Sequence, residues 1–411
     1  MITSAQGCLV VAALLLASDA SIAAQSQTRP KPAAPPAKTA GRSSTPANPE
    51  FDRLAREAAA ARDAGRLDEA IALYQKGLRL RPSWAEGSWS LGTALYELDK
   101  YAEAKEAFAR VVRLQPKHAG AYGFKGLSEF QLKEYDRALD DLMHATDLGV
   151  TEPKDLADAI AYHTAITMTR LEQYEFALGT LQNFARDGND SPRVIEALGM
   201  ALLRIPMIPS ELPADRRELV MLAGRAAAYR SARKPAAAKP AFELLVQRYP
   251  DTPNVHYAYG VYLLDEEPDR GIEEFKQELK ISGDHLPSIL QIAFEYLRRS
   301  DWESAKGWAQ RAVDLAPRDF TARRAIGQVL LETGSVAESI AQLEAGVRLA
   351  PDSPSMRFML ARAYQKAGRQ ADAERERAEF LRLDRLVRNR KQGTQSVGGI
   401  SDRGSVRPEK Q

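Results

Sequence analysis

The segments DEAIALYQKGLRLRP (68–82) and AEAKEAFARVVRLQP (102–116) carry one pattern twice, 34 residues apart. In both, an acidic residue and an alanine are followed after three residues by an aromatic ring, and a proline comes eight residues after the ring. Related segments follow at 303–317 and 337–351, with Ala309 and Leu343 at the ring position. A fixed spacing of this length is typical of a chain built from repeated structural units.

A second segment precedes these copies, as in WSLGTALYE (89–97) and RAIGQVLLE (324–332). Its glycine or alanine stands among apolar residues at i, i+3, i+4 and i+7, which is the spacing of an amphipathic helix. The two segments of a unit therefore predict two antiparallel helices, joined by a short turn and closed by the proline. One pair cannot bury its apolar face alone, so each unit depends on the next.

These units resemble the tetratricopeptide repeat (TPR) family, which favours a small residue at unit position 8, alanine at 20, a ring at 24 and proline at 32. The unit 85–118 matches with Gly92, Ala104, Phe108 and Pro116. Further units in recognisable register start near residues 51, 119, 158, 219, 253, 286, 320 and 354. The resemblance implies an all-α, right-handed α-solenoid of about nine TPR helix pairs.

The repeats are interrupted once. Residues 192–218 combine a single predicted helix with a Pro-rich insertion, in which Pro206, Pro209 and Pro213 exclude regular helix. The interruption divides the repeats into an N-terminal array (51–191) and a C-terminal array (219–384).

The insertion also contains three apolar residues, Ile205, Met207 and Ile208. They either form a hinge or a partner-binding loop, or pack against an exposed unit edge. Packing is the interpretation we favour.

Residues 1–24 are predicted to be a signal peptide. The run LVVAALLLA (9–17) is apolar, and the small residues of SIAA (21–24) suit signal-peptidase cleavage, although the preceding MITSAQG lacks Lys and Arg. The run has about half of the roughly 20 residues that a spanning helix needs, so no integral membrane span is expected. The signal predicts a periplasmic or secreted protein of the bacterial envelope.

Two other segments are predicted to be disordered. Residues 25–50 form a Pro/Ala-rich linker with six prolines and no large aliphatic or aromatic residue, so they cannot bury enough apolar surface to offset the entropy of ordering. Residues 385–411 form a basic tail with seven Lys or Arg and two Asp or Glu. Such a tail can contact an anionic surface weakly, but we favour a solvated end.

The composition argues against several classes of function. With 57 Lys and Arg against 55 Asp and Glu, the net charge of +2 gives no reason to expect a nucleic-acid partner. One cysteine and five scattered histidines predict no disulfide framework, metal site or cofactor. No phosphate-binding loop or nucleophile motif is present, so we expect no enzyme. The acidic pairs Asp140–Asp141 and Glu273–Glu274 are expected to be solvated charges on helix faces.

In proteins that resemble this one, the first helix of each unit lines a concave groove through positions 2, 5, 6, 9, 12 and 13. Aromatic and arginine side chains there are favoured at binding hot spots, so a bound polypeptide segment is the predicted partner. If the register slips by one residue, the rings of the N-terminal array belong to the core instead. The candidate groove residues are Trp89, Tyr96, Phe124, Phe130, Tyr162, Tyr257, Phe294, Arg324 and Phe358.

Family members that grip a C-terminal carboxylate use Lys, Asn and Arg at set positions of three units. Those positions hold Ala55, Ala59, Ser90, Gly120 and Phe124 here, so this clamp is absent. An extended or helical segment across an aromatic groove fits better.

Other functions stay open at this stage. The chain could be an accessory subunit for envelope assembly or secretion, or a regulatory subunit of an enzyme complex, acting through its convex face or the 205–218 loop. Self-association through unit edges is a third alternative. The sequence leaves the oligomeric state and the identity of the partner open.

Overall fold

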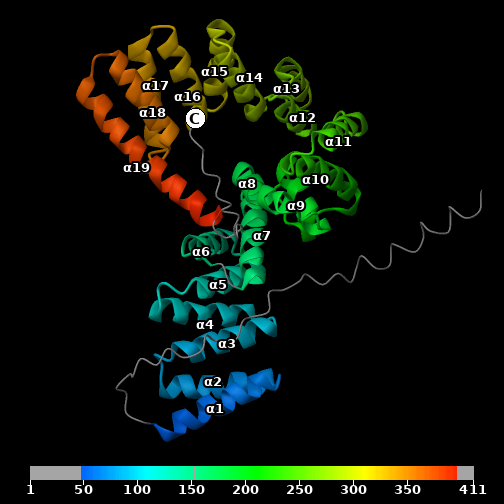
Figure 1. Ribbon diagram of the computed structural model, residues 1–411, viewed down its shortest axis with the longest axis vertical. Helices are drawn as coiled ribbons and strands as arrows, with labels where there is room; N and C mark the ends of the chain where they lie inside the picture. Colours follow the sequence, from blue (N-terminus) through cyan, green and yellow to red (C-terminus); the bar gives the residue numbers. More distant parts are fainter. Residues whose placement is uncertain (1–47, 151–152, 396–411) are drawn as a thin grey trace, which may run out of the picture.

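The computed structural model describes residues 48–150 and 153–395. Within them the chain forms nineteen α-helices and two short 3₁₀-helices, with no strand, which confirms the predicted all-α class (Figure 1). The predicted signal peptide (1–24) lies outside the described residues, as do residues 25–47 of the predicted linker and 396–411 of the predicted tail.

The N-terminal array consists of four consecutive helix pairs that correspond to the four predicted units. Within each pair the two helices pack against each other, and the second helix packs against the first helix of the next pair. The helices are α1 (Pro49–Asp63), α2 (Leu67–Leu80), α3 (Ala85–Glu97), α4 (Tyr101–Leu114), α5 (Ala119–Gln131), α6 (Tyr135–Asp147), α7 (Lys154–Arg170) and α8 (Tyr174–Arg186).

The C-terminal array continues the pattern with ten helices. They are α10 (Arg217–Ser231), α11 (Pro235–Arg248), α12 (Val255–Leu263), α13 (Pro268–Ser282), α14 (Leu286–Arg298), α15 (Trp302–Leu315), α16 (Phe320–Glu332), α17 (Val336–Leu349), α18 (Pro354–Lys366) and α19 (Gln370–Gln395). The last helix passes the boundary that we expected at residue 384, because the sequence LVRNRKQ (386–392) contains neither glycine nor proline and continues the helix.

Each pair turns at the same point of the unit. Position 15, between the two helices, has a left-handed backbone in eight of the nine units. The residues at this position are Gly65, Asp99, Lys133, Glu172, Arg233, Ser300, Gly334 and Gly368. The unit near 253 is the exception, since it is one residue short at this turn. A left-handed residue ends the first helix and reverses the chain.

The two helices of a pair cross where the sequence predicted a narrow point. A Cβ atom on Gly92 would lie 2.8 Å from the ring of Phe108, and one on Gly327 would lie 2.7 Å from Leu343. These are unit positions 8 and 24. The small residue therefore admits the large side chain of the second helix, as the repeat pattern implied.

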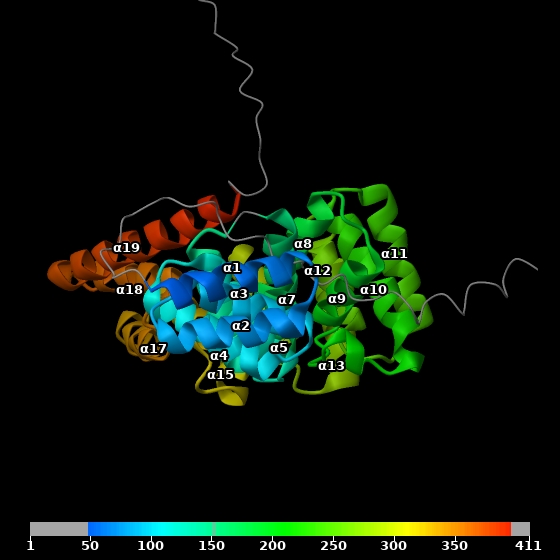
Figure 2. The ribbon, with the colours of Figure 1, turned by 90° about the horizontal axis from the view of Figure 1, so that it is seen from below.

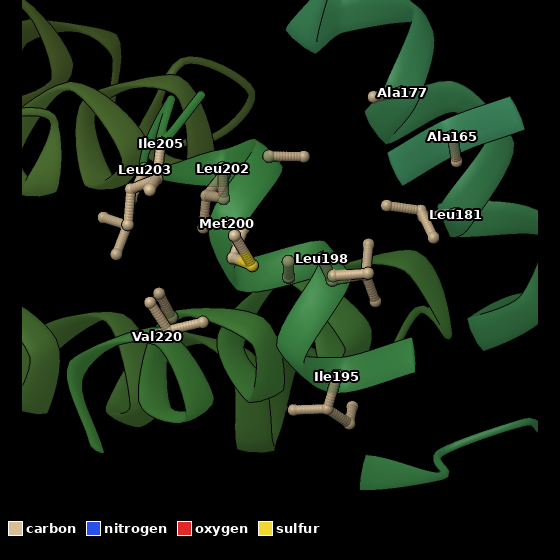
Figure 3. Close-up of a cluster of buried hydrophobic side chains, with 14 of the residues drawn as sticks. Ala165, Ala177, Leu181, Ile195, Leu198, Met200, Leu202, Leu203, Ile205 and Val220 are labelled. Atoms are coloured by element: carbon tan, nitrogen blue, oxygen red, sulfur yellow. The ribbon is translucent and has the colours of Figure 1, made fainter. Parts of the chain in front are cut away.

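The interruption is a packed segment. After α9 (Pro192–Leu202), the two 3₁₀-helices Pro209–Glu211 and Ala214–Arg216 lead to α10. Ile205, Ile208 and Leu212 are buried, and Figure 3 shows Ile205 close to Leu202 and Leu203 in the surrounding hydrophobic cluster. The insertion thus contributes to the core, as the interpretation that we favoured requires.

Helix α9 has a partner despite the insertion. Helix α10 packs against both α9 and α11, so it serves two neighbours. The crossing of α9 and α10 is close, because a Cβ on Gly199 would lie 1.9 Å from the carbonyl oxygen of Val220, and one on Gly224 would lie 1.9 Å from that of Ile195. The two arrays are therefore joined by a tight helix crossing.

The helices follow a curved path. Helices α1 to α6 stack one above the other, and the later helices form an arc in which α12, α14 and α16 lie on the inner side (Figure 1). Seen from below, α10 and α11 lie on the opposite side of α1–α3 from α17–α19 (Figure 2). The arc brings α19 back to α6, which it contacts.

Candidate functional site

Five of the predicted groove residues are core residues. Trp89, Tyr96, Phe124, Phe130 and Tyr162 are all buried, and Phe124 has no exposed surface. The expectation that these five rings line an accessible groove is therefore corrected. These five side chains instead fit the alternative prediction, in which the rings of the N-terminal array belong to the core.

The reason is the packing between successive units. The Phe124 ring of α5 stacks on Phe108 of α4, with 5.4 Å between ring centroids. Trp89 meets the edges of both, at 5.5 Å and 5.6 Å, and Tyr96 lies 5.2 Å from Phe124. These rings fill the space between neighbouring pairs, where the repeat needs bulk.

Helix α7 is enclosed in the same way. Its Tyr162 lies beneath the Arg193 guanidinium, 4.7 Å from the ring centroid, and burial raises the Tyr162 pKa to about 12. The neighbouring His163 lies 2.8 Å from the carbonyl oxygen of Ala159 through Nδ1, and burial lowers its pKa to about 4. His163 is therefore a neutral, packed residue at physiological pH.

The four predicted residues of the C-terminal array lie differently. Tyr257, Phe294 and Arg324 are half-buried, and 45% of Phe358 is exposed. They come from α12, α14, α16 and α18, which are the first helices of four successive units. We call Tyr257, Phe294, Arg324 and Phe358 the inner stripe, since α12, α14 and α16 lie on the inner side of the arc in Figure 1.

Arg324 is the charged member of the inner stripe. Its guanidinium carbon lies 4.4 Å from the centroid of the Phe294 ring, which is a cation–π distance. Within the described residues it has no hydrogen bond and no ion pair, and burial lowers the pKa of its guanidinium. The described part of the chain therefore holds a cation at this face without supplying an anion.

The ends of the inner stripe are fixed by neighbouring helices. Arg204, at the end of α9, lies 6.0 Å from the centroid of Tyr257 and 4.6 Å from that of Tyr174, and it pairs with Glu175 at 2.6 Å. At the other end, Phe358 lies 5.4 Å from the ring of Phe380 on α19. These contacts hold the stripe in place but leave Phe358 accessible.

The sequence analysis missed two buried charge clusters. Asp141 and Glu129 share the Lys125 ammonium between α5 and α6, with 3.2 Å between Lys125 Nζ and Glu129 Oε1. Glu274 lies 2.5 Å from Nδ1 of His256, and the Glu274 carboxylate raises the pKa of this histidine. One member of each acidic pair is thus engaged between helices and is not a solvated charge, which corrects our expectation.

Residues 48–150 and 153–395 contain no group of three or more His, Cys, Asp or Glu side chains placed to hold a metal ion. No helix among them combines the length and apolar character that a bilayer crossing requires. The predictions of no cofactor and no catalytic residue stay predictions.

Comparison with known proteins identifies the repeat. A family model described as "Tetratricopeptide repeat" matches residues 90–145 and 290–354, and one described as "TPR repeat" matches residues 60–99. These matches fall in both arrays. No curated protein sequence matches the chain.

Solved structures with similar folds share little sequence with the chain. MamA from Desulfovibrio magneticus RS-1 is 16% identical over 41% of this chain and 96% of that one, with a TM-score of 0.37. The Cut9 and Hcn1 hetero-tetramer of the APC/C is 11% identical over 84% of this chain and 89% of the matched chain, with a TM-score of 0.39. Likenesses of this size do not extend to partners or activity.

Proposed function

The chain is a tetratricopeptide repeat protein, and we propose that it is a non-enzymatic scaffold that binds a segment of another polypeptide along the inner stripe of the C-terminal array. Repeat proteins of this kind typically mediate protein–protein contacts through an extended curved surface. The observation that carries the proposal is the position of Phe294, Arg324 and Phe358 on three successive first helices, where Arg324 lies over the Phe294 ring and 45% of Phe358 is exposed.

The insertion and the N-terminal rings support this choice by their burial. Ile205 and Ile208 pack in the core, and only Met207 of the three apolar residues singled out in the insertion is half-exposed. A binding loop at 205–218 would have to expose side chains that the fold uses for packing. The accessory subunit and the enzyme regulator, which would act through the convex face or the 205–218 loop, are the alternatives to this proposal.

We also propose that the protein is exported. The support is the apolar run at 9–17 with the small residues at 21–24. Cell fractionation followed by mass determination of the purified chain tests this point. Export predicts a periplasmic or extracellular chain that begins at Gln25, whereas an intact Met1 on a cytoplasmic chain would contradict it.

The binding surface is tested by affinity isolation from an envelope extract. The chain from Gln25 is compared with the double variant Phe294→Ala/Phe358→Ala. Phe176→Ala is the matched control, because Phe176 on α8 is 69% exposed but lies outside the inner stripe. Circular dichroism first establishes that all three chains keep the same helicity.

A polypeptide that is recovered by the unmodified chain and by Phe176→Ala, and lost from the double variant, is the expected result. Recovery of the same polypeptide by all three chains would place the binding surface elsewhere. In that case Met207→Ala becomes the next variant to examine, because Met207 is the half-exposed apolar residue of the insertion.

A further inference from the structure

The partner chemistry of the inner stripe follows from the state of its arginines. Most arginines near the stripe have partners: Arg323 donates to the carbonyl oxygen of Pro317 and to Gln342, and Arg362 pairs with Glu332 at 2.8 Å. Arg357 pairs with Glu376 at 2.8 Å. Arg324 differs from these neighbours, because no acidic or amide side chain of the described residues reaches it.

The contact between Arg324 and Phe294 leaves the guanidinium donors free. The guanidinium carbon lies over the Phe294 ring, 4.4 Å from its centroid, and a phenyl ring has no oxygen or nitrogen to accept a hydrogen bond. The N–H groups of a guanidinium point outward in its plane, in a fork that matches the two oxygens of a carboxylate. The contact with Phe294 thus positions the group and leaves its N–H donors for an incoming anion.

Partial burial makes this edge selective. Half-buried Arg324 has lost part of its hydration, and burial lowers its pKa, with no nearby charge among the described residues to offset this loss. A partner carboxylate would restore the missing interaction in a poorly hydrated place, where a charge-assisted hydrogen bond is strong. The exposed ring of Phe358 offers an apolar contact on the next first helix, α18, which packs against α16 and carries Phe358 at the same unit position as Arg324.

We infer that the inner stripe recognises a segment of another protein that carries an Asp or Glu side chain next to an apolar residue. The carboxylate pairs with Arg324, and the apolar residue covers Phe358. The arrangement differs from a clamp built of several Lys and Asn residues, since it uses one arginine held on an aromatic ring. This inference rests on the proposed function, which it makes more specific.

The test uses a displayed library of random 12-residue peptides selected on the full chain. Peptides that bind are synthesised, and their affinities are measured by fluorescence anisotropy against the unmodified chain, Arg324→Gln, Arg324→Lys and Phe358→Ala. Arg318→Gln is the matched control, because Arg318 precedes the same helix but is exposed. Each peptide is also made with its Asp and Glu residues replaced by Asn and Gln.

We expect selected peptides to be rich in Asp and Glu. Loss of a charge-assisted pair predicts binding that is about tenfold weaker or more in Arg324→Gln, and no change in Arg318→Gln. Arg324→Lys keeps the positive charge but not the planar pair of N–H donors. Its affinity for the peptide should therefore lie between that of the unmodified chain and that of Arg324→Gln. The amide form of a peptide should bind Arg324→Gln and the unmodified chain equally well.

Three results would overturn the inference, and they differ in what they say of the proposed function. Peptides that lose affinity for Phe358→Ala but not for Arg324→Gln would support docking at the inner stripe. They would contradict the pairing of a partner carboxylate with Arg324. Peptides that bind all variants equally would contradict both the carboxylate pair and docking at the inner stripe. A library without any enriched peptide would also contradict both the carboxylate pair and the proposed binding of a polypeptide segment.

Discussion

Glu129 is a buried acid whose titration should be visible in the stability of the whole chain. Only 2% of the residue is exposed, and burial, together with its neighbour Asp141, raises the Glu129 pKa to about 7. The unfolded chain releases this proton near the usual pKa of 4.5. The folded chain therefore binds more protons between these values, and the free energy of unfolding falls as the pH rises from about 4.5 to about 7.

Replacing Glu129 by glutamine should remove this fall in the free energy of unfolding with rising pH. Each unit of pKa shift corresponds to about 1.4 kcal/mol, so Glu129→Gln should gain a few kcal/mol over the unmodified chain between pH 5 and pH 8. Urea denaturation at both pH values measures the difference. Glu106→Gln, an exposed substitution on α4, is the control. An equal pH dependence in the unmodified chain and Glu129→Gln would show that Glu129 is not the group responsible.

Gly224 is the residue on which the joint between the arrays depends. A methyl group there would lie 1.9 Å from the carbonyl oxygen of Ile195, so the α9 and α10 backbones would have to separate. Gly224→Ala should cost about 1–3 kcal/mol or more. Gly179→Ala on α8, where a Cβ meets nothing within 4 Å, should instead gain roughly 0.5–1 kcal/mol. Thermal unfolding measures the midpoints of Gly224→Ala and Gly179→Ala. Equal midpoints would contradict the claim that the α9–α10 crossing has no room for a side chain at Gly224.

The turn between the two helices of a pair is the feature that every unit but one repeats. Lys133 has φ of 61° at position 15, and it is exposed. A left-handed residue other than glycine costs about 1–2 kcal/mol, so Lys133→Gly should raise the free energy of unfolding by up to about 1 kcal/mol after the entropy of glycine is subtracted.

The reciprocal change gives the control for this prediction. Gly334 occupies the same unit position with φ of 91°, and a Cβ there meets nothing within 4 Å. Gly334→Ala should therefore lower stability by about 1 kcal/mol through backbone strain alone. If Lys133→Gly and Gly334→Ala shift the denaturation midpoint in the same direction, the left-handed backbone at position 15 does not determine the stability of the turn.

The helix pairs of both arrays could be predicted from sequence because they depend on contacts inside one unit. The small residue at position 8 meets the large one at position 24 within the same pair, as Gly92 meets Phe108. Both partners lie within a single 34-residue window. Local spacing alone therefore predicts the pairing and register of the helices, whereas the end of α19 differed from the expected boundary.

The accessible face could not be predicted in the same way, because it depends on contacts between units. Whether Trp89 lies in a groove or in the core is decided by its distance to Phe124, which belongs to the next pair. The burial of Glu129 likewise depends on how closely α6 packs against α5. A single sequence states the residue types at these positions but not the angle between the helices that carry them.

The curvature of the solenoid brings segments together that are distant in the sequence. Helix α19 is the last element of the C-terminal array, and it contacts α6, which belongs to the third pair. In Figure 1, the end of α19 returns to the N-terminal array beside α6. A solenoid whose ends were free would have only contacts between neighbouring units, so this contact makes the arc a closed one.

Closure of the arc predicts a fixed distance between α6 and α19. Spin labels on cysteines introduced at Met143 and Leu381, both exposed, report it by pulsed electron resonance after Cys8 is replaced by serine. We expect one narrow distance distribution, because the contact removes the bending freedom that a row of repeats accumulates along its length. Labels at Leu114 and Met143, within the N-terminal array, supply a rigid reference. A broad distribution for the first pair beside a narrow one for the second would mean that the arc opens in solution.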